Sequence, residues 1–202
     1  MKLIYFDFNG GRGEACRLAL HIAGIPFEDE RIPLDDWPGM KDSTPFGQLP
    51  ILEVDGERIT QSNSINRYVG KLGGLYPEEP LEALRCDEPM DAVDDLMNKI
   101  VPTFFIEDDE QKRKARAELA DGPIPVYLKS LGRILEDRGG EYFAGNRLTV
   151  ADLKVFLFVR YMRSGMLDYV ATDLPDTLAP NLVTHFERIN AHPAIVDWYA
   201  AH

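Results

Sequence analysis

The N-terminal third of the chain carries polar side chains whose types and positions suit a small charged ligand. Ser62 directly follows a predicted strand and begins a predicted helix, where its hydroxyl and nearby unpaired backbone N–H groups can bind a carboxylate. Gln61 can add an amide contact. Tyr5 stands near the C-terminal end of the first predicted strand, where ligands of open α/β sheets collect. The structural alternatives are that Ser62 only caps its helix and that Tyr5 is a core residue with a satisfied hydroxyl.

Three aspartates form a second candidate group. Asp91, Asp94 and Asp95 stand at positions i, i+3 and i+4 of a predicted helix, which places them on one face. A weak Mg²⁺ site and a solvated acidic surface both fit this spacing. The spacing alone leaves both alternatives open.

The elements that position Tyr5 and Ser62 follow from local patterns. Residues 2–6 and 27–32 read as strands, separated by a helix over residues 12–23 that ends at Gly24. Strands over residues 51–54 and 57–60 flank Asp55-Gly56, a two-residue hairpin signal, and a helix with Ser62 as its N-cap covers residues 62–71. This order predicts an α/β thioredoxin-like domain over residues 1–76.

The rest of the chain shows helical periodicity only. Gly73, Gly74, Pro77 and Pro80 mark a boundary, after which helices are predicted over residues 84–100, 111–136 with a break at 122–125, 150–166, 180–190 and 193–201. Thr149 and Asp152 have the form of a capping box, which supports the fold. We therefore expect an all-α domain over residues 80–202.

Composition limits the possible functions. The 202 residues carry a net charge of -12, which opposes nucleic acid and anionic membranes as partners. Cys16 and Cys86 have no metal-ligand spacing, no run of about 20 apolar residues is present, and no secretory signal is visible. A cytoplasmic location is expected.

One segment also resembles a known family. Pro45-Phe-Gly-Gln-Leu-Pro-Ile-Leu-Glu-Val-Asp-Gly56, followed by Gln61-Ser62, is similar to the glutathione-binding segment of cytosolic glutathione transferases. Asp36-Trp37-Pro38 and the three aspartates resemble the sigma class, which includes glutathione-dependent prostaglandin D synthase and the lens S-crystallins. The resemblance implies the glutathione transferase fold, glutathione as co-substrate, no tightly bound cofactor, and a cis Leu49–Pro50 bond.

The resemblance also implies roles for individual residues. The Tyr5 hydroxyl would donate to the glutathione sulfur with Arg12 in support, the Leu49 backbone would pair with the peptide, and Asp95 would reach the γ-glutamyl ammonium across a homodimer interface. Without the resemblance, Trp37 reads as packing and Lys41 as solvated surface. The implied glutathione site is Tyr5, Arg12, Trp37, Lys41, Gly47, Gln48, Leu49, Pro50, Gln61, Ser62 and Asp95 of the partner subunit. Gln48 replaces a lysine of the pattern, which weakens the glycyl end.

The sequence departs from the family pattern between Tyr5 and Glu14, where Asn9-Gly10-Gly11 contains one residue more. This loop borders both the sulfur and the second substrate, and it offers further donors to sulfur. An acceptor pocket is expected from Phe8, Asn9, Thr103 and Phe104, with aromatic core packing as the alternative. The expected activity is conjugation of glutathione to small hydrophobic electrophiles. Glutathione-dependent isomerisation, peroxide reduction and a non-catalytic crystallin-like role remain as alternatives.

Overall fold

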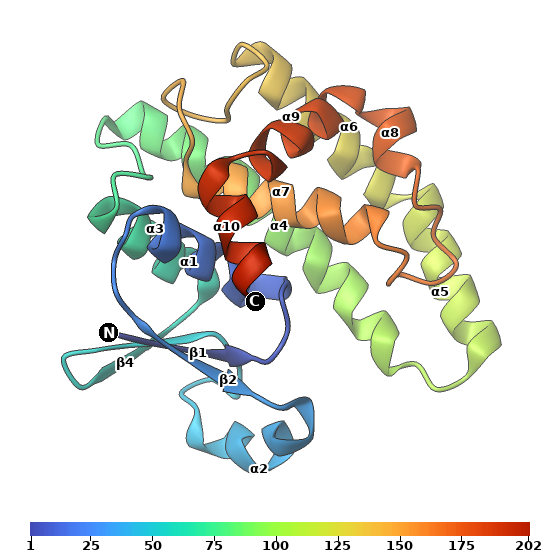
Figure 1. Cartoon of the computed structure of the whole chain (residues 1–202). Helices are drawn as coiled ribbons and strands as arrows, with labels where there is room; N and C mark the ends of the chain where they lie inside the picture. The colour runs from blue at the N-terminus through green and yellow to red at the C-terminus, as the bar shows by residue number, and fades with distance from the viewer. The chain divides into compact units, whose positions relative to one another are not determined.

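The structure is a computed structural model that describes residues 1–202. Contacts divide the chain into two compact units, of which the first contains Met1–Glu78 and His192–His202 and the second contains Glu79–Ala191. The first unit is a thioredoxin-like α/β domain and the second is all-helical, as predicted (Figure 1).

The first unit is built on a four-stranded sheet with the strand order β2-β1-β3-β4. β1 runs parallel to β2 and antiparallel to β3, and β3 pairs antiparallel with β4. Asp55 and Gly56 both have positive φ, as a tight two-residue hairpin requires, which confirms the predicted turn. The strands are β1 (Lys2–Phe6), β2 (Glu28–Ile32), β3 (Ile51–Val54) and β4 (Glu57–Thr60).

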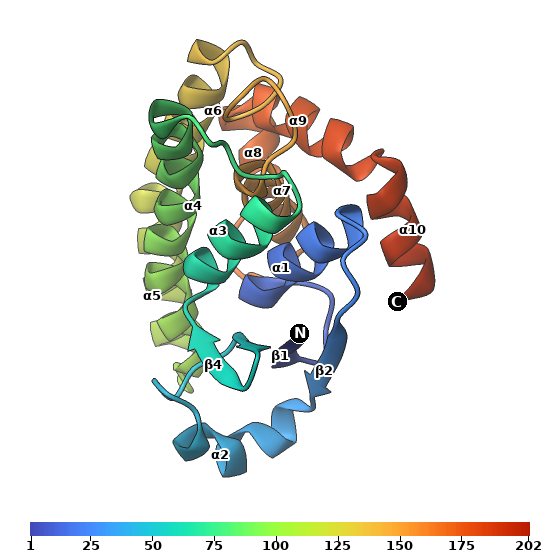
Figure 2. The same ribbon diagram turned by 90° about the vertical axis from the view of Figure 1, so that its left-hand side faces the viewer.

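Helices cover both faces of this sheet. Figures 1 and 2 show α1 (Gly11–Ile22) and α3 (Ser62–Leu72) over one face and α2 (Trp37–Met40) on the other. Short 3-10 turns, Leu34–Asp36 and Lys41–Ser43, flank α2. No helix was predicted here, because a four-residue helix is too short to show a helical period.

Helix α3 begins differently from the prediction, which made Ser62 its N-cap. The N-cap is Gln61, with a φ of 73°, and Ser62 is the first helical residue. Only Gln61 separates β4 from α3, so the reversal of the backbone occurs at this residue. Ser62 still lies in the first turn, where backbone N–H groups have no intrahelical acceptor.

The second unit is a bundle around α7 (Val150–Arg163). α7 is buried on all sides from Val150 to Val159, as expected for the central helix of a bundle. The predicted capping box is confirmed, since Asp152 Oδ2 accepts hydrogen bonds of 2.7 Å from both the backbone N–H and the hydroxyl of Thr149. The other elements are α4 (Pro80–Ile100), a 3-10 turn (Val101–Phe105), α5 (Asp109–Asp121), α6 (Pro123–Asp137), α8 (Leu174–Leu178) and α9 (Pro180–Asn190).

The three aspartates of α4 do not form one solvated face. Asp94 forms an ion pair with Lys154, a buried residue of α7, with 2.9 Å between Asp94 Oδ1 and Lys154 Nζ. Asp91 and Asp95 are exposed. No group of three or more His, Cys, Asp or Glu side chains is arranged to hold a metal ion. No helix combines the length and the apolar character needed to cross a membrane.

The last helix, α10 (Pro193–Ala201), belongs to the first unit although the predicted helical domain extends to residue 202. Trp198 Nε1 donates to Glu14 Oε1 of α1 at 3.0 Å, and Ile195 of the same helix is buried. Periodicity identifies this segment as a helix, but it does not show against which partner the apolar face packs.

Candidate active site

Tyr5 is held at both its ring and its hydroxyl. The residue lies in β1, only 4% exposed, and its hydroxyl oxygen accepts a hydrogen bond of 2.9 Å from the backbone N–H of Arg12 at the start of α1. Burial raises the pKa of the Tyr5 phenol above its ordinary value, while the Arg12 and Gly13 N–H groups and the charges of Arg12 and Arg17 oppose that rise. The phenol therefore keeps its proton at neutral pH and can donate it in a hydrogen bond.

Two glycines in the first turn of α1 lie so close to Tyr5 that no side chain fits there. A Cβ at Gly11 would lie 2.3 Å from the Tyr5 hydroxyl oxygen, and a Cβ at Gly13 would lie 2.3 Å from Tyr5 Cγ. Gly11 also has a φ of 66°, which L-residues rarely adopt. Neither residue was among the predicted site residues. The glycines at positions 10, 11 and 13, near the start of the predicted helix, were the sequence pattern that could have indicated this close contact.

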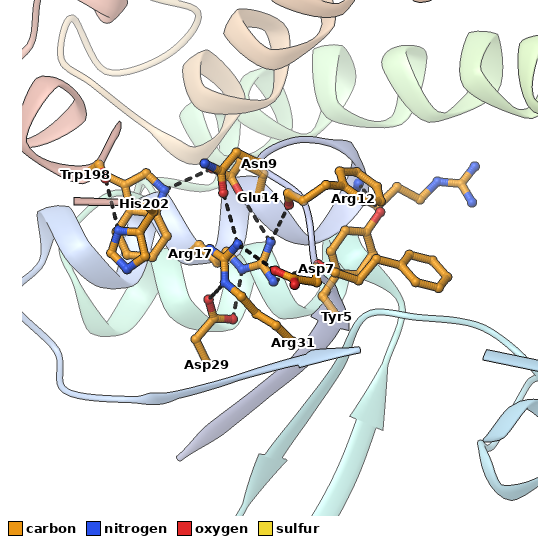
Figure 3. Close-up of polar contacts among 12 residues, drawn as sticks. Tyr5, Asp7, Asn9, Arg12, Glu14, Arg17, Asp29, Arg31, Trp198 and His202 are labelled. Atoms are coloured by element: carbon orange, nitrogen blue, oxygen red, sulfur yellow. Dashed lines mark hydrogen bonds and ion pairs between the residues drawn. The ribbon is translucent and has the colours of Figure 1, made fainter. Parts of the chain in front are cut away.

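The longer loop places Phe8 and Asn9 on different sides of the site. The Phe8 ring is 37% exposed, and its centroid lies 5.7 Å from that of Tyr5. Asn9 instead accepts a hydrogen bond of 3.1 Å from Nη1 of Arg31 on β2. Figure 3 shows Asn9 beside Arg31 and the Tyr5 hydroxyl beside Arg12. Of these two loop residues, Phe8 is therefore the one that lies next to Tyr5.

Several predicted binding residues belong to one small cluster of buried side chains or pack against it. Leu49 is buried in a cluster with Tyr5 and Ile51, and the half-buried Trp37 packs against it. The Leu49–Pro50 peptide bond is cis, as predicted. The structure therefore brings together the strand that carries Tyr5, the backbone of Leu49 and the indole of Trp37.

The remaining predicted residues of the first unit lie at its surface turns. Lys41 is exposed and lies against Gly47, since a Cβ added to that glycine would be 3.4 Å from Lys41 Cε. Gln48 and Gln61 are exposed, whereas Ser62 is 6% exposed. Gly47 has a φ of 61°, which explains a glycine at this turn.

A buried charged cluster lies behind Tyr5 and was not predicted (Figure 3). Arg17 of α1 is fully buried and pairs with Glu14 at 3.2 Å and with Asp29 of β2 at 2.9 Å. Asp29 also accepts from Nε of Arg31 at 2.7 Å. Charged residues in a sequence suggest surface positions, so only the three-dimensional pairing reveals this cluster.

The predicted residues of the second unit have internal partners or face solvent. The buried Thr103 hydroxyl donates to the Ile100 carbonyl at 2.7 Å and accepts from Arg116 Nε at 3.2 Å. Phe104 is 40% exposed, and the Arg116 guanidinium carbon lies 4.7 Å from its ring centroid. Asp95 is exposed on α4.

The arrangement around Tyr5 is suited to an anion. The Tyr5 hydroxyl presents one proton, Ser62 lies in the first turn of α3, and Leu49 lies outside the strand ladder next to a proline. No acidic side chain forms a hydrogen bond with the Tyr5 hydroxyl, whose oxygen accepts from the backbone N–H of Arg12.

Comparisons with known proteins show the family to which the chain is similar. Residues 1–71 match the family model described as Glutathione S-transferase, N-terminal domain, and residues 94–202 match that described as Glutathione S-transferase, C-terminal domain. Glutathione S-transferase 1 of Ascaris suum is 37% identical over 202 residues, which cover 98% of this chain and 95% of the relative.

Two further relatives carry the name of a prostaglandin synthase. Hematopoietic prostaglandin D synthase of Gallus gallus is 36% identical over 197 residues, which cover 98% of this chain and 94% of the relative. The solved structure of prostaglandin synthase D of Nilaparvata lugens superposes with a TM-score of 0.87 at 32% identity, over 98% of this chain and 96% of that one. The matches extend over both units, and the chain therefore belongs to the glutathione S-transferase family.

Proposed function

We propose that this transferase activates glutathione through a hydrogen bond from the Tyr5 hydroxyl to the sulfur. The observation that carries the proposal is the 2.9 Å hydrogen bond from the Arg12 N–H to the Tyr5 oxygen, which leaves the phenolic proton to point away from α1. Because burial raises the pKa of Tyr5, the phenol acts as a donor and not as a base. A hydrogen bond to a charged group contributes roughly 1.5–3 kcal/mol, enough to lower a thiol pKa by about one to two units.

The chemical step follows from the thiolate. The sulfur attacks an electrophilic carbon of a small hydrophobic acceptor, a sulfur–carbon bond forms, and the displaced electron pair leaves with the leaving group or moves onto the acceptor. The thiol proton goes to solvent before the attack, and an adduct takes up a proton afterwards. Phe8, which is partly exposed beside Tyr5, is the first-unit residue best placed to contact the acceptor.

The rest of glutathione is proposed to lie along the edge near Leu49. The Leu49 N–H and C=O would pair with the cysteinyl backbone, since Pro50 gives no N–H to the sheet at that point. Ser62 and Gln61 would bind the γ-glutamyl carboxylate at the positive end of α3. Trp37, Lys41 and Gln48 would hold the glycyl carboxylate, with Gly47 shaping the turn and the Arg12 side chain supporting the thiolate.

A sigma-like homodimer in the cytoplasm is part of the proposal. The first unit exposes apolar side chains beside a cavity of about 410 Å³ between the β3–β4 hairpin and α3, including Ile59 at 43% and Tyr68 at 41% exposure. Such a patch is typical of an interface. Exposed Asp95 of the partner subunit would then complete the glutathione site. Sedimentation of a monomer at micromolar concentration with full glutathione affinity would contradict this assignment.

A second candidate activity comes from the relatives that are named prostaglandin D synthases. Isomerisation of a prostaglandin endoperoxide also uses a glutathione thiolate, so the same Tyr5 hydrogen bond would serve it. A non-catalytic, crystallin-like role is less well supported, because a purely structural protein has no physical need to keep Tyr5, Arg12, Trp37, Gln61 and Ser62 together.

The test compares the protein with its Tyr5→Phe variant. A thiolate absorbance titration of the glutathione complex reports the pKa of the bound thiol, which should rise by about one to two units in the variant. Turnover at pH 7 should fall about ten- to a hundredfold with nearly unchanged glutathione affinity, and the loss should shrink at high pH.

A panel of electrophiles, hydroperoxides and a prostaglandin endoperoxide, assayed with both proteins, identifies the main reaction. An unshifted titration and full turnover in Tyr5→Phe would reject Tyr5 as the donor to sulfur. Binding of glutathione with no turnover of any acceptor would favour the non-catalytic role.

A further inference from the structure

Arg17 is a buried cation whose donors are almost completely used. Its side chain has no exposed surface, and its Nε donates to Asp29 at 2.9 Å. Nη1 donates to the Phe8 carbonyl at 2.9 Å and to Glu14 at 3.2 Å, and Nη2 donates to the Phe6 carbonyl at 3.0 Å. Four of its five N–H donors are thus accounted for by groups on β1, β2, α1 and the loop.

Two of these contacts hold the segment that leads from Tyr5 to α1. The Phe6 and Phe8 carbonyls lie on either side of Asp7, at the point where the chain leaves β1. Backbone carbonyls that leave a sheet need another donor, and Arg17 donates to the Phe8 carbonyl and adds a second donor to the Phe6 carbonyl. The only other backbone bonds of this turn are from Asp7 to Ile32 and from Phe8 to Phe6. Arg17 therefore supports the backbone of the longer loop, while Arg31 contacts the side chains of Asn9 at 3.1 Å and Asp7 at 3.5 Å.

Arg17 also contacts Tyr5 directly. Its guanidinium carbon lies 5.5 Å from the centroid of the Tyr5 ring, within the range of a cation–π contact. Glu14 and Asp29 carry the opposite charge, and Arg31 is the second cation on Asp29. Glu14 is itself fixed by the Trp198 indole at 3.0 Å. The cluster can hold the guanidinium in one place because each of its members has several partners.

We propose that Arg17 is a positioning residue for the sulfur site, which sets the distance between the Tyr5 hydroxyl and the Arg12 N–H by tying the intervening loop to β2 and α1. Loss of this support would let the loop move and would change the direction in which the hydroxyl proton points. The inference rests on the proposed role of Tyr5. Consistent with it, the charge of Arg17 is one of the influences that oppose the rise in the Tyr5 pKa.

The alternative is that Arg17 is only a buried ion pair that stabilises the fold. Both roles predict a less stable protein after substitution, so stability does not distinguish them. They differ in what they predict for the pKa of the bound glutathione thiol. If Arg17 positions Tyr5, its substitution raises the pKa of the bound glutathione thiol, whereas a purely structural role leaves the titration of the folded fraction unchanged after substitution.

The experiment is a double-mutant cycle between Arg17→Lys and Tyr5→Phe, read by the thiolate absorbance titration of the glutathione complex. Lysine keeps the charge but cannot make the planar set of contacts. In the Tyr5 background, Arg17→Lys should raise the bound-thiol pKa by about 0.5 to 1 and lower kcat at pH 6.5 about three- to tenfold, with KM for glutathione changed less than about threefold. In the Tyr5→Phe background the same substitution should change kcat less than about twofold.

Arg133→Lys is the matched control, because Arg133 is exposed on α6 of the second unit. If Arg17→Lys does not fold, the double variant Arg17→Gln with Glu14→Gln removes both charges of the pair, which disturbs a protein less than leaving one charge unpaired. The same pKa rise is expected for it in the Tyr5 background only.

The outcomes separate the inference from the function on which it rests. A fall in kcat of equal size in both backgrounds, or an unshifted thiol pKa in a folded Arg17 variant, would overturn the positioning role. The proposed function of Tyr5 would instead be refuted if glutathione bound to the unmodified protein formed thiolate only over the pH range in which free glutathione does.

Discussion

Replacing Gly11 with alanine should disable the sulfur site while leaving the fold in place. The new Cβ would lie 2.3 Å from the Tyr5 hydroxyl oxygen, whereas ordinary contact begins at 3.4 Å, so the hydroxyl must retreat by about 1.1 Å (3.4 minus 2.3). That shift breaks the 2.9 Å hydrogen bond from Arg12 and moves the donor away from sulfur. A misplacement of about 1 Å can reduce a rate by roughly 100-fold.

The backbone conformation of residue 11 accounts for the expected loss of stability, and the clash with the Tyr5 hydroxyl accounts for the expected loss of activity. Because Gly11 has a φ of 66°, alanine there should lower the free energy of unfolding by about 1–2 kcal/mol. Loss of the hydrogen bond to thiolate, worth roughly 1.5–3 kcal/mol, should raise the bound-thiol pKa by about one to two units. Turnover at pH 7 should therefore fall about ten- to a hundredfold and recover as the pH rises.

Gly10→Ala is the matched control for this prediction. Gly10 has an extended backbone, with φ of 165°, and a Cβ there would meet only the Phe8 ring at 3.7 Å. Its turnover should stay within about twofold of the unmodified protein, and its stability should change by less than about 1 kcal/mol. Thiolate titrations and thermal melts of both variants provide the measurements. A folded Gly11→Ala protein with an unshifted titration would refute the packing argument.

Three further predictions concern single side chains. Ser62→Ala should weaken glutathione binding by about 1–3 kcal/mol in calorimetry if its hydroxyl meets a charged carboxylate; a loss of stability with unchanged affinity would show that the residue only supports α3. Lys154→Met should lower the free energy of unfolding by about 1–3 kcal/mol, because Asp94 loses its 2.9 Å partner on α7, and Asp94→Asn in the same protein should recover part of the loss; denaturant curves without recovery would argue against the pairing. Burial raises the pKa of the Cys86 thiol to about 11, so this residue should resist alkylation at pH 8 until the protein unfolds, and rapid labelling of the native protein, read by mass spectrometry, would disagree.

Features that depend on neighbours in the chain were predictable from the sequence. The hairpin at Asp55-Gly56 follows from its turn residues, and the strand over residues 2–6 follows from its composition. The capping box at Thr149 and Asp152 spans only three residues. The cis Leu49–Pro50 bond and the expected ligand came from the resemblance of one segment to a family, which supplies information that propensity does not contain.

Contacts between distant residues were decided only by the tertiary structure. Glu14 and Trp198 are 184 positions apart, and the ion pair of Asp94 with Lys154 joins two helices whose charged residues read as solvent-facing. Even the short span from Tyr5 to Gly11 and Gly13 depends on how α1 packs against β1, because a glycine has no side chain through which a sequence pattern could reveal its contact. Arg17 shows the same limit most clearly, since a cation is placed in the core only when carbonyls and carboxylates from several elements converge around it, and a linear pattern does not record that convergence.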